Sequence, residues 1–220
     1  MTSRATAAVT VTAALTSAGA LGYAELALPA QPLLSDYALV PGGMPPTLLG
    51  MLALAVACVS LSYGMVSSDP RGTAATRVLL LAAAAGLMLS AIFPTDPAAA
   101  ELKSLTGEIH RWSAAVVFTT LPVAGWTLAR GRAGLARWSA VRALAVTSAL
   151  VLAVYLAAHP ASITSGWIGG AGYYGLLERA LVVADMVLLM VMAAATTRPS
   201  AVAVPAVEPA AEKRHERLAA

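Results

Sequence analysis

The stretch VLLLAAAAGLMLSAIFPTDPAAAELKSLTGEIHRWSAAVVFTTLPVAGWTL, residues 78–128, consists of two apolar runs joined by a short polar linker. The ionisable residues of the linker are Asp96, Glu101, Lys103, Glu108, His110 and Arg111. Of the 220 residues in the chain, 59% are apolar and only 11% are charged, and the mean hydropathy is +0.76. Soluble domains carry about 25% charged residues. The composition therefore predicts an integral membrane protein, with the lipid bilayer as its surroundings.

Apolar runs of this kind recur along the chain, and we expect each of them to form one membrane-spanning helix. The runs cover residues 5–24, 47–66, 78–93, 112–128, 143–158 and 174–195. About 20 helical residues cross the hydrocarbon core. The third and fifth runs are shorter, but Arg77 and Arg142 precede them and can reach the interface while one more turn enters the membrane. Alanine and leucine dominate, so the sequence predicts an all-α bundle of six helices rather than a β-barrel.

Two domains are expected, a transmembrane domain over residues 1–195 and a tail over 196–220. The tail is rich in alanine and proline and ends in mixed charges, which favours a disordered cytoplasmic extension. The first run has an alternative interpretation. It ends in the small residues Ala18, Gly19 and Ala20, a pattern typical of a cleavable signal peptide. Cleavage would leave five helices in the same orientation.

The distribution of lysine and arginine predicts the orientation of the bundle. If six helices alternate in direction, eleven of the fourteen basic residues fall on one side of the membrane. They are Arg4, Arg71, Arg77, Arg130, Arg132, Arg137, Arg142, Arg198, Lys213, Arg214 and Arg217. Only Lys103, Arg111 and Arg179 fall on the other side. Because basic loops stay in the cytoplasm, we expect a multi-pass protein of the cell membrane with both termini cytoplasmic.

Aromatic residues near the ends of the runs predict an interfacial belt that anchors the bundle. On the outer side the belt would contain Tyr23, Tyr37, Trp112, Trp167, Tyr173 and Tyr174. Trp138 would lie on the inner side. The only cysteine, Cys58, lies within an apolar run, which excludes an internal disulfide and a cysteine metal cluster. No signature of nucleotide or nucleic-acid binding is present, so we expect no nucleic-acid partner.

Acidic residues and histidines gather on the predicted outer side. They are Glu25, Asp36, Asp96, Glu101, Glu108, His110, His159 and Glu178. Asp96 precedes Pro97, a pattern that favours the N-cap of a short helix in the linker. Asp185 lies seven residues beyond Glu178, on a similar helix face and about 10 Å deeper. A charge at that depth needs a partner or a water-filled cavity, because it costs at least about 2–3 kcal/mol on insertion scales.

Short motifs in this order resemble a known family. They are SDY at 35–37, FPTD at 93–96, GEIH at 107–110 and GLLER at 175–179. With six helices, this order is similar to the bacterial and archaeal membrane proteins of the domain of unknown function family 998. The resemblance extends over residues 8–195 and implies a six-helix fold with a shared site. The residues that it assigns to the site are Asp36, Asp96, His110, Glu178 and Arg179. The family supplies no reaction.

Three functions are consistent with these residues, and whether the protein is an enzyme is open. In the first, the outer polar cluster binds a small ligand, a lipid head group or a protein partner. In the second, a membrane-embedded hydrolase holds a metal ion through Asp36, Asp96 and His110, with His159 or Glu178 as further ligands. In the third, His110 and His159 are axial ligands of a haem. The sequence favours binding without a resident cofactor. Transport through Asp185 is a variant of binding.

A structural role is the alternative to all three. In that interpretation the outer acids form an ion-pair network with Arg111 and Arg179 as the basic partners.

Overall fold

The computed structural model describes residues 3–97, 103–132 and 136–197. Six long helices run through this part of the chain, and each is long and apolar enough to cross a membrane. They are α1 (Ser3–Ala27), α2 (Met44–Ser68), α3 (Ala74–Ile92), α4 (Leu105–Ala129), α5 (Ala136–Ala158) and α7 (Tyr174–Thr197). Short helices join them, namely η1 (Ser35–Leu39), α6 (Ser165–Ile168) and η2 (Gly170–Gly172). The predicted all-α architecture with six spans is confirmed.

Most of the helices extend beyond the apolar runs that predict them. Helices α4 and α5 each begin seven residues earlier than the runs that start at 112 and 143. The extra turns contain polar residues such as Glu108 and His110 in α4. Helix α4 begins where Ser104 caps it, since the Ser104 hydroxyl accepts a hydrogen bond from the backbone N–H of Gly107 at 3.0 Å. Hydropathy therefore predicts the part of each helix that lies in the membrane core. The position of the capping residue determines where α4 begins.

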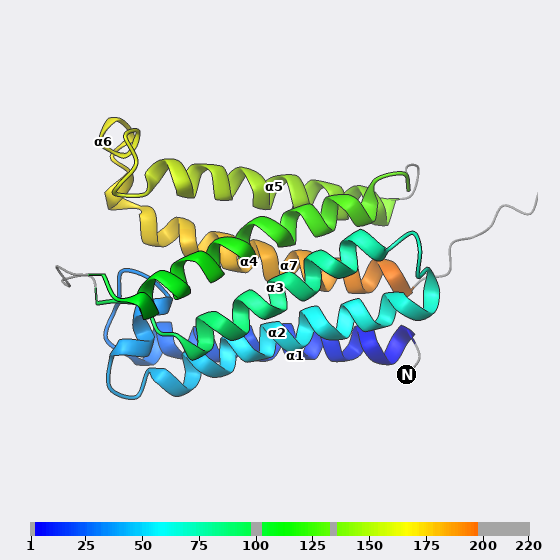
Figure 1. Cartoon of the computed structure of the whole chain (residues 1–220), viewed down its shortest axis with the longest axis horizontal. Helices are drawn as coiled ribbons and strands as arrows, with labels where there is room; N and C mark the ends of the chain where they lie inside the picture. The colour runs from blue at the N-terminus through cyan, green and yellow to red at the C-terminus, as the bar shows by residue number, and fades with distance from the viewer. Residues whose placement is uncertain (1–2, 98–102, 133–135, 198–220) are drawn as a thin grey trace, which may run out of the picture.

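The six long helices form a closed ring in which each packs against the next. Helices α1, α2, α3, α4 and α5 follow one another, and α7 closes the ring between α5 and α1. Helix α7 also contacts α2 and α4, which makes it the innermost helix. Figure 1 shows that α1 starts and α7 ends at the same end of the bundle, here called the terminal end. The opposite end carries η1 and α6 and is called the η1 end.

The bundle is apolar both inside and outside. Its core contains large side chains without exposed surface, among them Leu121 and Leu128 of α4 and Leu188 and Leu189 of α7. The outward faces of the helices carry exposed apolar residues such as Leu150, which is 62% exposed. An all-round apolar surface is what a helix needs when one face packs on protein and the other faces lipid.

The basic residues are segregated as the sequence predicts. Arg132 at the terminal end forms an ion pair with Asp69 at 3.1 Å, and its guanidinium lies 4.9 Å from the ring centre of Trp138. Lys103, Arg111 and Arg179 lie at the η1 end. Residues 198–220, which hold the tail and its basic cluster, lie outside the described residues. The side of the membrane that each end faces stays a prediction.

Gly86 allows α3 and α4 to pack closely. A Cβ atom at this position would lie 2.8 Å from the Ser113 carbonyl oxygen and 2.9 Å from Cγ2 of Val117. Both distances are shorter than a normal van der Waals contact. Small residues at such positions let helix backbones approach in lipid, where packing is the main source of association.

We predict that Gly86→Ala lowers the thermal stability of the protein in detergent, because overpacking at a helix contact costs about 1–3 kcal/mol. The matched control is Gly19→Ala, since a Cβ at Gly19 meets no atom within 4 Å. Alanine is the better helix former by about 1 kcal/mol, so the control should be neutral or stabilised. Equal melting temperatures for the two variants would contradict close packing at Gly86.

Candidate functional site

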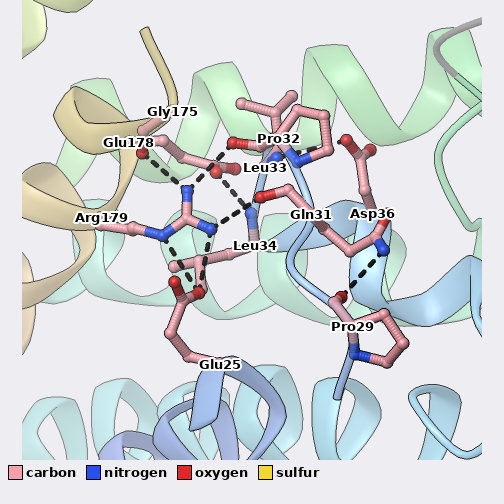
Figure 2. Close-up of polar contacts among 10 residues, drawn as sticks. All are labelled: Glu25, Pro29, Gln31, Pro32, Leu33, Leu34, Asp36, Gly175, Glu178 and Arg179. Carbon is pink, nitrogen blue, oxygen red and sulfur yellow. Dashed lines mark hydrogen bonds and ion pairs between the residues drawn. The ribbon is translucent and has the colours of Figure 1, made fainter. Parts of the chain in front are cut away.

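Arg179 connects α7 to the end of α1 and to the loop that follows α1. Its Nε and Nη2 contact Glu25 Oε2 at 3.0 and 2.9 Å, and Nη2 also donates to the Gln31 carbonyl oxygen at 2.9 Å. Its Nη1 donates to the carbonyl oxygens of Pro32 and Gly175, each at 3.0 Å. Figure 2 shows the guanidinium enclosed by these acceptors. A guanidinium has five N–H donors, and the protein itself uses all of them. Arg179 is therefore a structural residue.

Two carboxylates hold the backbone of the segment that leads into η1. Glu178, in the first turns of α7, accepts a hydrogen bond from the Leu34 backbone N–H at 2.6 Å. Asp36 accepts one from the Leu33 N–H at 3.2 Å (Figure 2). Burial raises the pKa of Asp36 above its ordinary value, and the hydrogen bond from Leu33 opposes this effect. The innermost helix thus shapes the loop that covers the η1 end.

Asp96 organises the start of α4. Its carboxylate accepts hydrogen bonds from the backbone N–H of Ser104 at 3.0 Å and from the Ser104 hydroxyl at 2.5 Å. These bonds hold the pKa of Asp96 below its ordinary value. The predicted role as the cap of a short linker helix falls on residues 98–102, which lie outside the described part of the chain. Within that part, Asp96 instead orients Ser104, the N-cap of α4.

His110 joins α4 to the end of α3. The imidazole is buried, and its Nδ1 lies 3.0 Å from the Ser90 carbonyl oxygen and 2.9 Å from that of Phe93. Carbonyl oxygens only accept, so Nδ1 carries a hydrogen and donates to them. These carbonyls belong to the last turn of α3, which has no helical partner for them. Nε2 remains as the ring nitrogen that a ligand can use.

A large cavity extends from the η1 end into the middle of the bundle. It has a volume of about 600 Å³ and is lined by residues of all six long helices. Leucine, valine, alanine and aromatic residues form most of its wall. Its polar residues near the η1 end include His110 and Glu178, and Asp185 lies deeper on the same face of α7. The predicted alignment of Glu178 and Asp185 on one helix face is confirmed.

The cavity reaches as deep as Asp185 in the middle of α7. The carboxyl of Asp185 is only 1% exposed and accepts a hydrogen bond from the Ser148 hydroxyl of α5 through Oδ1. Asp185 lies eleven residues into α7, which corresponds to about 16 Å from the η1 end at 1.5 Å per residue. Ser17 of α1 lies ten residues before the end of its helix, at a depth of about 15 Å. The cavity therefore has one polar level near its mouth and another near the middle of the membrane.

A second hollow of about 650 Å³ lies outside the first at the η1 end. Asp36 and Arg179 line this hollow, whereas His110 and Glu178 line the first cavity, which reaches into the bundle and is called the inner cavity below. Asp96 lines both. The structure therefore gathers the five predicted site residues at one end of the bundle but divides them between two adjoining spaces.

An aromatic cluster lies at the wall of the inner cavity, and the sequence did not reveal it. The rings of Tyr155 and Tyr174 are stacked with centroids 4.5 Å apart, and their hydroxyls form a hydrogen bond of 2.6 Å. Phe118 and His159 contact this pair edge-on, at 6.2 and 5.3 Å between ring centroids. The hydroxyl of Tyr155 within an apolar run was the available signal. The assignment of Tyr37 to the interfacial belt was wrong, because this side chain is 0% exposed.

The geometry does not support the metal and haem predictions. Across residues 3–97, 103–132 and 136–197, no group of three or more His, Cys, Asp or Glu side chains is placed to hold a metal ion. Of the two candidate haem ligands, His110 donates through Nδ1 to two carbonyls and keeps Nε2 free. His159 instead accepts the Ala161 N–H through Nδ1 at 3.1 Å, which places the hydrogen of the neutral ring on Nε2 and leaves His159 unable to act as the second axial ligand. Burial lowers the pKa of His159. The metal-dependent hydrolase and the haem carrier stay predictions from sequence.

The fold and the cavity define a multi-pass α-helical membrane protein whose polar residues gather at one end and along the innermost helix. A family model described as "Protein of unknown function (DUF998)" matches residues 6–195, which is most of the chain. The protein belongs to the DUF998 family, as its motifs suggest. No curated protein and no solved structure matches the chain.

We predict that Arg179→Lys destabilises the protein although it keeps the charge. An ammonium has three N–H donors and a point geometry, so at least two of the five bonds would be lost. Bonds to charged groups contribute about 1.5–3 kcal/mol each, and we expect a loss of at least about 2 kcal/mol in unfolding experiments in detergent.

Arg111→Lys is the control for this substitution. Arg111 forms one ion pair with Glu108 at 3.1 Å, and both side chains are exposed. Such pairs contribute at most about 1 kcal/mol. If Arg179→Lys were as stable as this control, Arg179 would not be the residue that holds the loop.

Proposed function

We propose that the protein binds a small amphiphilic molecule in the inner cavity. The observation that carries this proposal is that three residues of the cavity wall each have a buried oxygen without a partner in the described part of the chain. Ser17 Oγ, Ser90 Oγ and Asp185 Oδ2 have no hydrogen-bond partner among the described residues. Buried polar atoms without partners are rare and cost about 1–3 kcal/mol each. A ligand with polar groups and an apolar body would satisfy these oxygens and fill the space between them.

The cavity has the size and lining of a small-molecule site. Ligand sites have volumes of about 300–1,000 Å³ and mainly apolar walls with a few polar groups. His110 Nε2 and Glu178 supply polar groups near the mouth of the cavity, and the Tyr155–Tyr174 pair supplies aromatic surface. Two residues of the polar cluster predicted from the sequence, His110 and Glu178, would thus form the outer part of a binding site that extends deeper into the bundle.

Access from the membrane is supported by the arrangement of α4 and α5. Figure 1 shows that these helices lie close together at the terminal end and diverge toward the η1 end. The cavity wall includes residues on the outer surface there, such as Trp112 of α4, which is 70% exposed, and Leu156 of α5. Only 17% of the most apolar stretch of α5 is buried, against 39–44% in the other five helices. An amphiphile could therefore enter sideways from the lipid.

The orientation of the site follows from the same proposal. We propose that the protein lies in the cell membrane with its terminal end in the cytoplasm. The concentration of arginines at this end supports that orientation. The mouth of the cavity then lies at the extracytoplasmic surface. The ligand would bind in the half of the bilayer that adjoins this surface.

A substitution that fills the cavity tests the proposal. In nanodiscs, a photoreactive dodecanol carrying a diazirine should label the wild-type cavity wall in a saturable way that excess dodecanol prevents. We predict that Ala114→Trp, on the cavity wall of α4, reduces this saturable labelling about tenfold or more, because an indole occupies the ligand's space.

Ala149→Trp is the matched control for the filled cavity. Ala149 lies on the exposed side of α5 and nine residues from the η1 end of its helix, and Ala114 lies nine residues from the η1 end of α4. The control should label like the wild type. Saturable labelling of Ala114→Trp at the wild-type level would overturn the proposed site.

A further inference from the structure

We propose that Asp185 binds the ammonium group of a hydrophobic amine, which makes a lipophilic cation the ligand class of the cavity. This inference rests on the proposed function and concerns the deeper polar level. Asp185 is 1% exposed, lines the cavity, and has its Oδ1 occupied by the Ser148 hydroxyl. Its Oδ2 has no hydrogen-bond partner in the described part of the chain. The protein thus presents one free acceptor of an acid at the middle of the bilayer.

The basic residues of the cavity wall are too far away to neutralise Asp185. Those that the structure describes there are Lys103, which precedes α4, and Arg111, together with His110 and His159. Arg111 lies six residues into α4, at a depth of about 9 Å, whereas Asp185 lies at about 16 Å. A carboxylate at the middle of the bilayer without a partner costs at least about 2–3 kcal/mol. A cationic ligand would remove this cost, which makes charge the main determinant of selectivity.

A second oxygen at the same depth fits an ammonium group. Ser17 Oγ of α1 lines the cavity and is also without a hydrogen-bond partner among the residues described. The ammonium of a primary amine has three N–H donors. Asp185 Oδ2 can accept from one of them, and Ser17 Oγ is a further acceptor on the wall of the same cavity. A carboxylate or phosphate ligand offers no donor for either position.

The wall above Asp185 also favours a cation with an apolar body. Tyr155, Tyr174 and Phe118 line the same cavity. Aromatic faces attract cations, and their edges and neighbouring leucines pack against alkyl chains. Glu178 lies seven residues before Asp185 on the same helix, so a second acidic group faces the cavity about 10 Å above the first.

The experiment compares three competitors of equal chain length. In zwitterionic nanodiscs, unlabelled dodecylamine, dodecanol and dodecanoic acid each compete with the photoreactive dodecanol for the saturable site. We expect dodecylamine to compete at least about tenfold better than dodecanol in the wild type, the ratio that a charge-assisted hydrogen bond confers. Dodecanoic acid should be the weakest competitor. With each competitor's concentration expressed per lipid molecule, a wild-type ratio near one between amine and alcohol would overturn the inference.

Asp185→Asn provides the decisive comparison, because it removes the charge and keeps the size and the hydrogen bond to Ser148. We expect the amine-to-alcohol ratio to fall about tenfold to near one, while labelling by the dodecanol probe persists. Comparing ratios between variants cancels the different partitioning of the competitors into lipid. If Asp185→Asn keeps the wild-type ratio, Asp185 is not the amine site.

Glu178→Gln tests whether the amine binds at Asp185 or at the acidic group near the mouth of the cavity. The amide oxygen of the substituted side chain would still accept the bond from the Leu34 N–H, so the loop is preserved. The amine preference should fall less in this variant than in Asp185→Asn, because Glu178 lies about 10 Å above the proposed ammonium position. Loss of the preference in Glu178→Gln but not in Asp185→Asn would place the amine at the mouth and overturn the inference. If the wild type showed no saturable labelling at all, the proposed function itself would be refuted.

Discussion

Polar groups that enter the hydrocarbon must find partners within the protein, because lipid offers none. Helix α7 carries three such groups, Glu178, Arg179 and Asp185, and the η1 half of the bundle is organised around their requirements. Arg179 meets this requirement with four hydrogen bonds and an ion-pair contact to the end of α1, the loop that follows α1 and its own helix. Glu178 meets it through the Leu34 N–H. Asp185 meets it only in part, through Ser148.

The contacts of Glu178 and Arg179 shape the η1 end of the cavity that Asp185 lines. Because Glu178 and Arg179 fix the loop before η1 against α7, this loop covers the η1 end instead of entering the bundle. His110 similarly fixes α4 against the last turn of α3. Polar contacts therefore fix the loop and the helix ends around the mouth of the cavity. Packing of α5 against α4 and α7 supplies the remaining wall.

Much of the architecture could be predicted from the sequence because hydrophobicity is a local property. The six apolar runs predict the six helices, and the arginines predict which loops share an end of the bundle. Asp185 could be placed on the face of Glu178, because seven residues are close to two helical turns. The two loop carbonyls that Arg179 binds could not be predicted, since they belong to an irregular segment distant in sequence, whereas its ion pair with Glu25 is of the kind that the structural alternative expects. The contact between Tyr155 and Tyr174 likewise depends on how α5 packs against α7.

The proposed binding site requires an open cavity that follows the inner face of α7 into the bundle. Two single-cysteine variants in a Cys58→Ala background test it, because Val182 lines the cavity whereas the adjacent Val183 is 58% exposed on the outer apolar surface. In nanodiscs, a charged, water-soluble methanethiosulfonate should modify Val182→Cys and leave Val183→Cys unreacted in lipid. If both cysteines stay unreacted, or only Val183→Cys is modified, the cavity described here does not exist in the membrane.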